Sequence, residues 1–188
     1  NYIMFSRDSG NLGDTDFVCT TKDKLAAKSS NLSARPVDGQ VLRKYSLAVS
    51  ATAEYTDYHG GTVADALAAI NATLTRINGV FETDLAVSLE LIATNEQVVY
   101  TDTATDPYTG SLAALSDQAQ NTLTDVIGED NYDIGIVFHN GPDGGNAGFI
   151  GAICIDNSKG SAYASSQTPE GPIFDLDFAA HEMGHQLG

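Results

Sequence analysis

The chain has 188 residues, of which 42% are hydrophobic, so it is long enough for one domain with a real core and an additional arm. Its formal net charge is −16, from 9 basic and 25 acidic residues, and such a surface repels nucleic acid and anionic membranes. No apolar run approaches the roughly eighteen residues of a membrane helix. We therefore expect a soluble protein that binds neither nucleic acid nor membrane.

Residues 1–41 form the first predicted region, an extended arm. They are rich in Ser, Asp, Asn, Gly and Lys, and their short apolar clusters at 2–5 and 17–19 predict one or two short strands. The chain begins at Asn1 without an initiator Met or a signal peptide, which fits a processed or recombinant segment. We interpret 1–41 as an arm and a candidate propeptide remnant, and 42–188 as the folded domain.

The predicted domain opens with a strand, a helix and a second strand. β-forming residues alternate through 42–54, which predicts the first strand. Thr62 and Asp65 form a capping-box pattern, and the apolar residues that follow keep helical spacing until Gly79, where we expect the helix to end. Residues 85–93 alternate again and predict the second strand.

A polar, turn-rich stretch follows at 95–110. Its Asp102 and Asp106 provide oxygen ligands of the kind that bind calcium, but the spacing of a known calcium loop is missing, and an ordinary loop is the alternative. Apolar residues at helical spacing predict a second helix over 112–127. The apolar, β-branched run 133–139 predicts a buried central strand.

This alternation of strands and helices predicts an α/β fold. We expect a mixed, mostly parallel, twisted sheet with two long helices and a third helix at the end of the chain. Residues 140–146 are typical of a loop, and 156–172 are typical of a Gly/Ser-rich connection to the third helix.

The last eight residues are His-Glu-Met-Gly-His-Gln-Leu-Gly. His181 and His185 are four residues apart, so on a helix both imidazoles lie on one face and can bind the same ion. Glu182 can then take a proton from a zinc-bound water and pass it to a leaving amine, which is the chemistry of peptide hydrolysis. The pattern predicts most of a catalytic zinc site, with two unrelated surface histidines as the alternative.

This motif resembles the signature of the metzincin zinc metallopeptidases, HExxHxxGxxH, whose first four fixed positions match His181, Glu182, His185 and Gly188. The wider pattern over 42–188 is similar to the reprolysin-like branch found in secreted bacterial proteases. The resemblance implies a zincin-like N-terminal subdomain, zinc as the cofactor, a protein or peptide substrate, and a secreted zymogen.

Residues 147–152 stand where metzincins have the edge strand that pairs with an extended substrate. Unpaired N–H and C=O groups on such an edge align a peptide by strand addition, and glycines let the substrate backbone approach closely. The predicted substrate-binding residues are Gly148, Phe149, Ile150, Gly151 and Ala152.

The resemblance places a third His ligand three positions beyond Gly188, so the catalytic site of this chain is expected to be incomplete. Its expected partner is the C-terminal remainder of the same protein. With two protein ligands, we expect residues 1–188 to bind zinc weakly and to hydrolyse peptides negligibly. The alternative function is a non-catalytic extracellular module, or an inert processed fragment of the same fold.

Cys19 and Cys154 are the two cysteines of the chain. In a secreted protein they can form one long-range disulfide. Alternatively, Cys19 lies where a propeptide would be, and a propeptide thiolate can occupy the open position of the zinc and keep the enzyme latent. Two free buried thiols are the third interpretation, and all three remain open.

Overall fold

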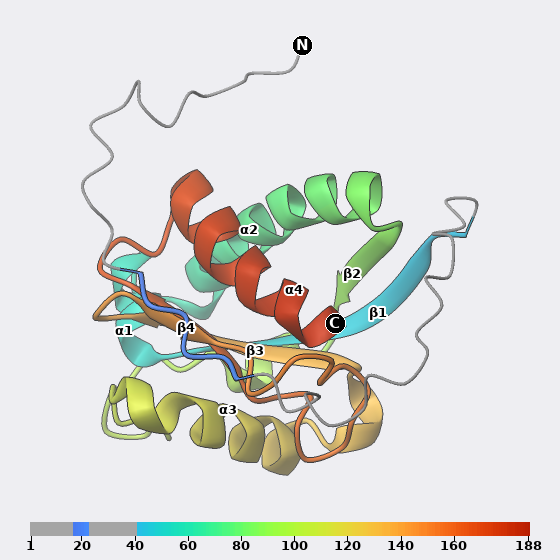
Figure 1. The fold of residues 1–188 in the computed structure, drawn as a ribbon. Helices are drawn as coiled ribbons and strands as arrows, with labels where there is room; N and C mark the ends of the chain where they lie inside the picture. Colours follow the sequence, from blue (N-terminus) through green and yellow to red (C-terminus); the bar gives the residue numbers. More distant parts are fainter. Residues whose placement is uncertain (1–16, 23–40) are drawn as a thin grey trace.

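The computed structural model describes residues 17–22 and 41–188, and it has the predicted mostly parallel α/β architecture (Figure 1). A five-stranded sheet has the spatial order β2-β1-β3-β5-β4. In chain order the strands are β1 (Arg43–Ala51), β2 (Val87–Leu91), β3 (Ile134–Asn140), β4 (Gly144–Asn146) and β5 (Ala162–Ser166). The first four strands of the spatial order run parallel, whereas β4 is antiparallel to β5 and forms one edge.

Helices cover both faces of the sheet (Figure 1). α2 (Val63–Asp84) and the C-terminal helix lie on one face, and α3 (Leu112–Val126) lies on the other. The C-terminal helix consists of η4 (Ile173–Ala180), which is wound as a π-helix, and α4 (His181–Leu187), which continues it without a break. The short elements are α1 (Ala53–Tyr58), η2 (Asn95–Val98) and η3 (Glu129–Asn131). In the part of the chain that the structure describes, no helix has the length and hydropathy needed to cross a membrane.

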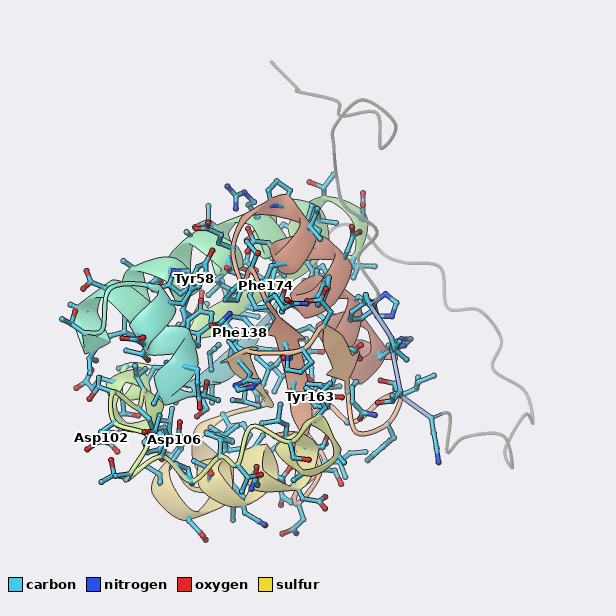
Figure 2. The ribbon with its side chains drawn as sticks, turned by 90° about the vertical axis from the view of Figure 1, so that its left-hand side faces the viewer. Tyr58, Asp102, Asp106, Phe138, Tyr163 and Phe174 are labelled. Carbon is cyan, nitrogen blue, oxygen red and sulfur yellow. The ribbon has the colours of Figure 1, made fainter. Side chains whose placement is uncertain are left out.

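The sheet divides the apolar core into two layers, because successive strand residues point to opposite faces. On the α2 face, Ile136 of β3 and Phe174 of η4 belong to the largest cluster of buried residues. On the α3 face, smaller clusters contain Leu123 and Tyr163. Figure 2 shows Phe138 next to Phe174, and their ring centroids are 5.2 Å apart. Aromatic packing therefore holds the C-terminal helix against the sheet.

Three predictions of local structure are wrong. The predicted loop 140–146 contains the edge strand β4. α2 does not end at Gly79 but continues to Asp84. A glycine inside a helix costs only about 1 kcal/mol, and Phe81 beyond it packs into the core. The predicted connection 156–172 contains β5, a fully buried strand. Its sequence, AYASS, consists mainly of small and polar residues, so it lacks the β-branched pattern on which strand prediction depends.

Candidate metal centre

The candidate centre begins with the two histidines of α4. His181 and His185 lie one turn apart on the same face, and their Nε2 atoms are 3.0 Å from each other. Both nitrogens therefore approach one position, as the four-residue spacing predicts. His181 is exposed and His185 is half-buried. This position is consequently accessible to an ion from the surface.

Polar contacts anchor both ends of the helix that carries these histidines. At its start, the buried Asp175 carboxylate accepts a hydrogen bond from Thr73 Oγ1 at 2.6 Å and pairs with Arg76, so η4 is bound to α2. At its end, the buried Gln186 donates from Nε2 to the carbonyl of Gly135 in β3 at 3.3 Å. These contacts fix the height of both imidazoles above the sheet.

Segment 17–22 runs along the outer edge of β4 as a short parallel strand. Thr20 N donates to the Gly145 carbonyl at 3.0 Å, and Gly145 N donates to the Val18 carbonyl at 3.2 Å. Alternate side chains of a strand point to opposite faces. The odd-numbered side chains of the segment contact the C-terminal helix, and the even-numbered ones lie on the α3 side.

Cys19 brings a thiol to the two histidines. Its Sγ lies 3.6 Å from His185 Nε2. The neighbouring Phe17 supports this placement, because its ring packs on Phe178 with a centroid distance of 4.3 Å and on His181 with a centroid distance of 5.5 Å. Within residues 17–22 and 41–188, the three candidate ligand atoms of Cys19, His181 and His185 all lie within 4.8 Å of one another.

This donor set fits zinc. In a tetrahedral site with Zn–N of about 2.0–2.1 Å and Zn–S of about 2.3 Å, neighbouring donors are roughly 3.3–3.6 Å apart. The Nε2–Nε2 distance of 3.0 Å and the Sγ–Nε2 distance of 3.6 Å are close to that range. Thiolate and imidazole ligands also favour zinc over calcium or magnesium, which bind oxygen.

Glu182 lies beside the three donors and is fully buried. Its Oε2 accepts a hydrogen bond from Thr21 Oγ1 at 2.8 Å, whereas its Oε1 has no hydrogen-bond partner among the described residues. Burial raises the pKa of the Glu182 carboxyl, and hydrogen bonds from Thr21 and Cys19 and the charges of both histidines oppose that rise. A carboxylate with one unsatisfied oxygen next to the metal position can accept a proton there.

Gly145 determines how closely Glu182 approaches the edge strand. A Cβ at Gly145 would lie 2.4 Å from Glu182 Oε1 and 2.8 Å from its Cγ, closer than real Cβ contacts allow. The missing side chain therefore lets the carboxylate lie against the backbone of β4. A peptide that pairs with β4 passes next to this carboxylate, as segment 17–22 does.

The edge strand is not at the predicted position. Residues 147–152 form turns, and the edge strand is β4, immediately before them. Gly148 and Gly151 have φ angles of +76° and +77°, which an extended strand does not accommodate. Gly151 N donates to the His185 carbonyl at 2.8 Å, and Phe149 pairs with Lys22. A role in substrate binding stays a prediction for Gly148, Phe149, Ile150, Gly151 and Ala152.

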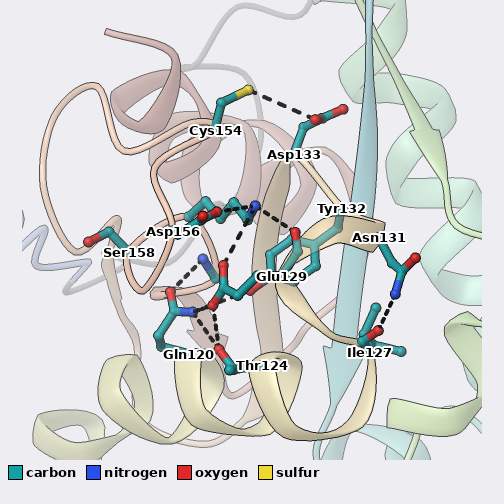
Figure 3. A network of polar contacts seen from close by, with 12 residues as sticks. Gln120, Thr124, Ile127, Glu129, Asn131, Tyr132, Asp133, Cys154, Asp156 and Ser158 are labelled. Atoms are coloured by element: carbon teal, nitrogen blue, oxygen red, sulfur yellow. Dashed lines mark hydrogen bonds and ion pairs between the residues drawn. The ribbon is translucent and has the colours of Figure 1, made fainter.

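Cys19 and Cys154 are free thiols in this structure, and a disulfide between them stays a prediction. Cys19 lies in the candidate centre, whereas Cys154 is exposed and its Sγ is 3.9 Å from Asp133 Oδ1 (Figure 3). The interpretation with two buried free thiols does not hold for Cys154, because that residue is exposed.

Asp102 and Asp106 lie near α1, away from segment 17–22 (Figure 2). Asp102 Oδ1 accepts from Ala104 N at 2.8 Å, and Asp106 accepts from Ala53 N at 2.5 Å and from Tyr108 N at 2.8 Å. Both carboxylates therefore order the local backbone, as in an ordinary loop. Neither belongs to a group of three candidate metal ligands in the described part of the chain. Calcium binding stays a prediction.

Thr21 and Gly145 are residues of the centre that the sequence analysis did not identify. Thr21 lies 161 positions before Glu182, and no local pattern marks its hydroxyl as a partner of that carboxylate. For Gly145 a signal exists, because a glycine pair at a sheet edge often marks a close backbone approach. This signal was not recognised in the surrounding NGPDGGN sequence, because such a composition is also typical of loops.

A comparison with known protein families also supports a metal centre in this chain. Residues 41–188, which are most of the chain, match the reprolysin-like metallopeptidase family M12B. No curated protein matches the chain. The matched region contains the whole mixed sheet and the helix with His181, Glu182 and His185. The chain therefore belongs to the reprolysin-like M12B metallopeptidases.

Proposed function

We propose that this protein is a secreted, zinc-dependent endopeptidase and that the described conformation is its latent form. The family supports metallopeptidase chemistry in general and a protein or peptide substrate. The observation that carries the proposal is the meeting of His181, His185 and Glu182 beside a sheet edge on which an extended segment lies. The family resemblance supports secretion, and the net charge of −16 argues against a nucleic-acid ligand.

In the proposed reaction, His181 and His185 would hold zinc, which when bound would supply Lewis acidity to activate water and polarise the scissile carbonyl. Glu182 accepts a proton from the attacking water and passes it to the leaving nitrogen. Its Oε1, which has no hydrogen-bond partner in the described part of the chain, is available for this transfer. Gly145 keeps the carboxylate close to the peptide on the edge strand.

In this proposal β4 aligns the substrate. Segment 17–22 already pairs with β4 through two backbone hydrogen bonds and places Thr21 against Glu182. A substrate that adds to the same edge places its own backbone there. Because both peptides need the same N–H and C=O groups of Gly145, the segment must leave before a substrate binds.

Cys19 is the proposed latency ligand. Its thiolate would complete a three-donor site with His181 and His185 and would occupy a position that the reaction needs open. The Thr21 hydroxyl occupies Oε2 of Glu182 at the same time. One segment thus occupies the metal position and one of the two oxygens of the proton acceptor.

Cys19 also changes the expected zinc affinity of this chain. The sequence expectation counted two protein ligands, and the thiolate supplies a third from within residues 1–188. We infer that the chain retains zinc through Cys19, whereas hydrolysis needs the third His that the resemblance places beyond Gly188. The alternative function, a non-catalytic module, predicts no zinc.

Elemental analysis after dialysis tests the zinc site. We expect about one zinc per chain in the wild type and in the control Cys154→Ser, because zinc sites of this kind hold one ion. Cys19→Ser should lose much of the zinc, and His181→Ala should lose all of it. Zinc in none of these proteins would favour the non-catalytic module.

Hydrolysis of a quenched peptide library by the parent protein tests endopeptidase activity. Modification of Cys19 by a thiol reagent should raise turnover, because it releases the latent segment. Glu182→Gln should lower turnover by about 10²-fold or more while zinc content stays unchanged. Equal turnover in Glu182→Gln and the wild type would remove Glu182 from the reaction.

A further inference from the structure

A groove on the α3 side of segment 17–22 has no part in the proposed chemistry. It has a volume of about 700 Å³ and lies between α3, β4 and the chain near Ser158. The even-numbered side chains of the segment, Val18 and Thr20, line it, because the odd-numbered ones face α4. A peptide on this edge therefore presents every second side chain to the groove.

The Thr20 hydroxyl is bound closely in this groove. Asn146 Nδ2 donates to Thr20 Oγ1 at 2.7 Å, and Thr20 Oγ1 donates to the Gly145 carbonyl at 3.2 Å. The buried Tyr163 also lines the groove. The position thus suits a group that both donates and accepts, as a hydroxyl does.

The orientation of Asn146 is set by the protein and not by its occupant. Its Oδ1 accepts hydrogen bonds from Gly148 N at 2.5 Å and from Ser116 Oγ at 3.4 Å. Its Nδ2 is therefore directed toward the peptide and favours a hydrogen-bond acceptor. Asp117 and Asp143 also line the groove, and its described lining contains no Lys or Arg, so a neutral acceptor is favoured over a carboxylate.

We propose that this groove is a side-chain subsite for an extended peptide substrate and that Asn146 makes it select Ser or Thr over apolar side chains of similar shape. The inference rests on the proposed endopeptidase function, in which a substrate replaces segment 17–22 on β4. Selection follows because an apolar side chain leaves Asn146 Nδ2 without the acceptor that it has in Thr20 Oγ1.

The segment itself provides a test that needs no hydrolysis. In metal-free protein with Cys154→Ser, the rate of Cys19 alkylation by iodoacetamide measures how often the segment leaves β4. Thr20→Ser should react like the parent, whereas Thr20→Val, which keeps the shape and loses the hydroxyl, should react roughly five- to tenfold faster. Equal rates for Thr20→Val and Thr20→Ser would overturn the subsite.

Asn146→Ala serves as the second arm of a double-mutant cycle. The substitution also removes the hydrogen bond that Gly148 N donates to Asn146 Oδ1. The absolute alkylation rate of this variant is therefore not the readout. The ratio of the Thr20→Val rate to the Thr20→Ser rate should fall most of the way to one in the Asn146→Ala background. An unchanged ratio would show that Asn146 does not read the hydroxyl.

Cleavage of a peptide library by the zinc-loaded parent peptidase tests the role in substrate selection. At one position relative to the cut, Ser and Thr should be enriched over Val, and Asn146→Ala should abolish the enrichment. An effect on alkylation without this enrichment would overturn the substrate role and restrict the groove to the chain's own segment. Absence of all hydrolysis would overturn the proposed function and the substrate role with it, while alkylation would still decide whether the groove recognises a hydroxyl.

Discussion

At the residue scale, Gly145 lies where the proton acceptor and the edge strand meet. Because its missing Cβ would lie 2.4 Å from Glu182 Oε1, Gly145→Ala should push the carboxylate away from the peptide. We expect turnover of the parent peptidase to fall at least about tenfold, and the overpacking to cost about 1–3 kcal/mol of stability. Kinetics, zinc content and thermal unfolding measure these effects.

Gly184→Ala is the matched control for this substitution. Gly184 lies in α4, and a Cβ there would meet nothing within 4 Å outside the helix's own backbone. The change should therefore preserve turnover and stabilise the helix by up to about 1 kcal/mol. If Gly145→Ala and Gly184→Ala had the same turnover, close approach at Gly145 would not be a requirement of the site.

His139 provides a second residue-scale prediction, because it is a buried imidazole at the end of β3. Its Nδ1 lies 3.0 Å from Thr52 Oγ1 and 3.8 Å from Glu54 Oε2. Burial lowers the pKa of His139, and the Glu54 carboxylate opposes that shift. Since the folded pKa lies below the ordinary value of 6.5, the stabilisation is complete above pH 6.5 and is lost as the pH falls through the folded pKa.

We expect His139→Asn to weaken this pH dependence. Asn can keep the hydrogen bond to Thr52 but cannot take up a proton. Its unfolding temperature should be lower than that of the wild type near neutral pH and should decline less steeply as the medium is acidified. Thermal unfolding at a series of pH values measures both curves, and parallel curves would assign the acid sensitivity to other groups.

At the scale of elements, the contact between α2 and η4 fixes the helix of the metal centre. Asp175 is 1% exposed, and its partners are Arg76, which is 49% exposed, and Thr73. Arg76→Met removes the charge that compensates a buried carboxylate, so we expect a loss of about 3 kcal/mol in chemical denaturation. Lys44→Met breaks an exposed pair with Glu90 and should leave the free energy of unfolding nearly unchanged. Similar small losses in both variants would contradict an anchoring role for Asp175.

Elements with long periodic patterns were predictable from the sequence. The start of α2 is confirmed, because Asp65 N donates to Thr62 Oγ1 at 3.1 Å. β3 is confirmed as a central buried strand, and α3 occupies 112–126, close to its predicted range. The spacing of His181 and His185 also predicted that their nitrogens meet. The sequence pattern that predicts each of these features is local, because it lies within one helix turn or one strand.

Features that depend on tertiary contacts were not predictable. β5 forms from small residues because neighbouring strands and helices cover it completely, and β4 pairs through glycines whose composition suggests a loop. Cys19 and His185 are 166 positions apart, so no local pattern in the sequence predicts that the thiol lies beside the histidines. Thr21 had no signal at all, because a hydroxyl in a polar arm is common.

At the scale of the whole molecule, the candidate centre connects parts that are distant in sequence. Cys19 comes from segment 17–22, which lies along β4, and His181 and His185 come from the helix that packs across the sheet. An ion held by all three residues would therefore fasten segment 17–22 to the helix and the sheet edge. Removal of the ion should loosen this connection and destabilise the fold.

A ligand that binds only the folded state stabilises it by about 2.7 kcal/mol at a hundred times its dissociation constant. For a domain of this size that corresponds to about 5–10 °C in the unfolding temperature. We expect a chelator to lower the unfolding temperature of the wild type and of Cys154→Ser by such an amount, to lower that of Cys19→Ser by less, and to leave His181→Ala unchanged. Calorimetry with and without chelator measures the shifts. If Cys19→Ser shifted as much as the wild type, the thiol would contribute nothing to binding of the ion. Backbone pairing with β4 alone would then hold segment 17–22 in place.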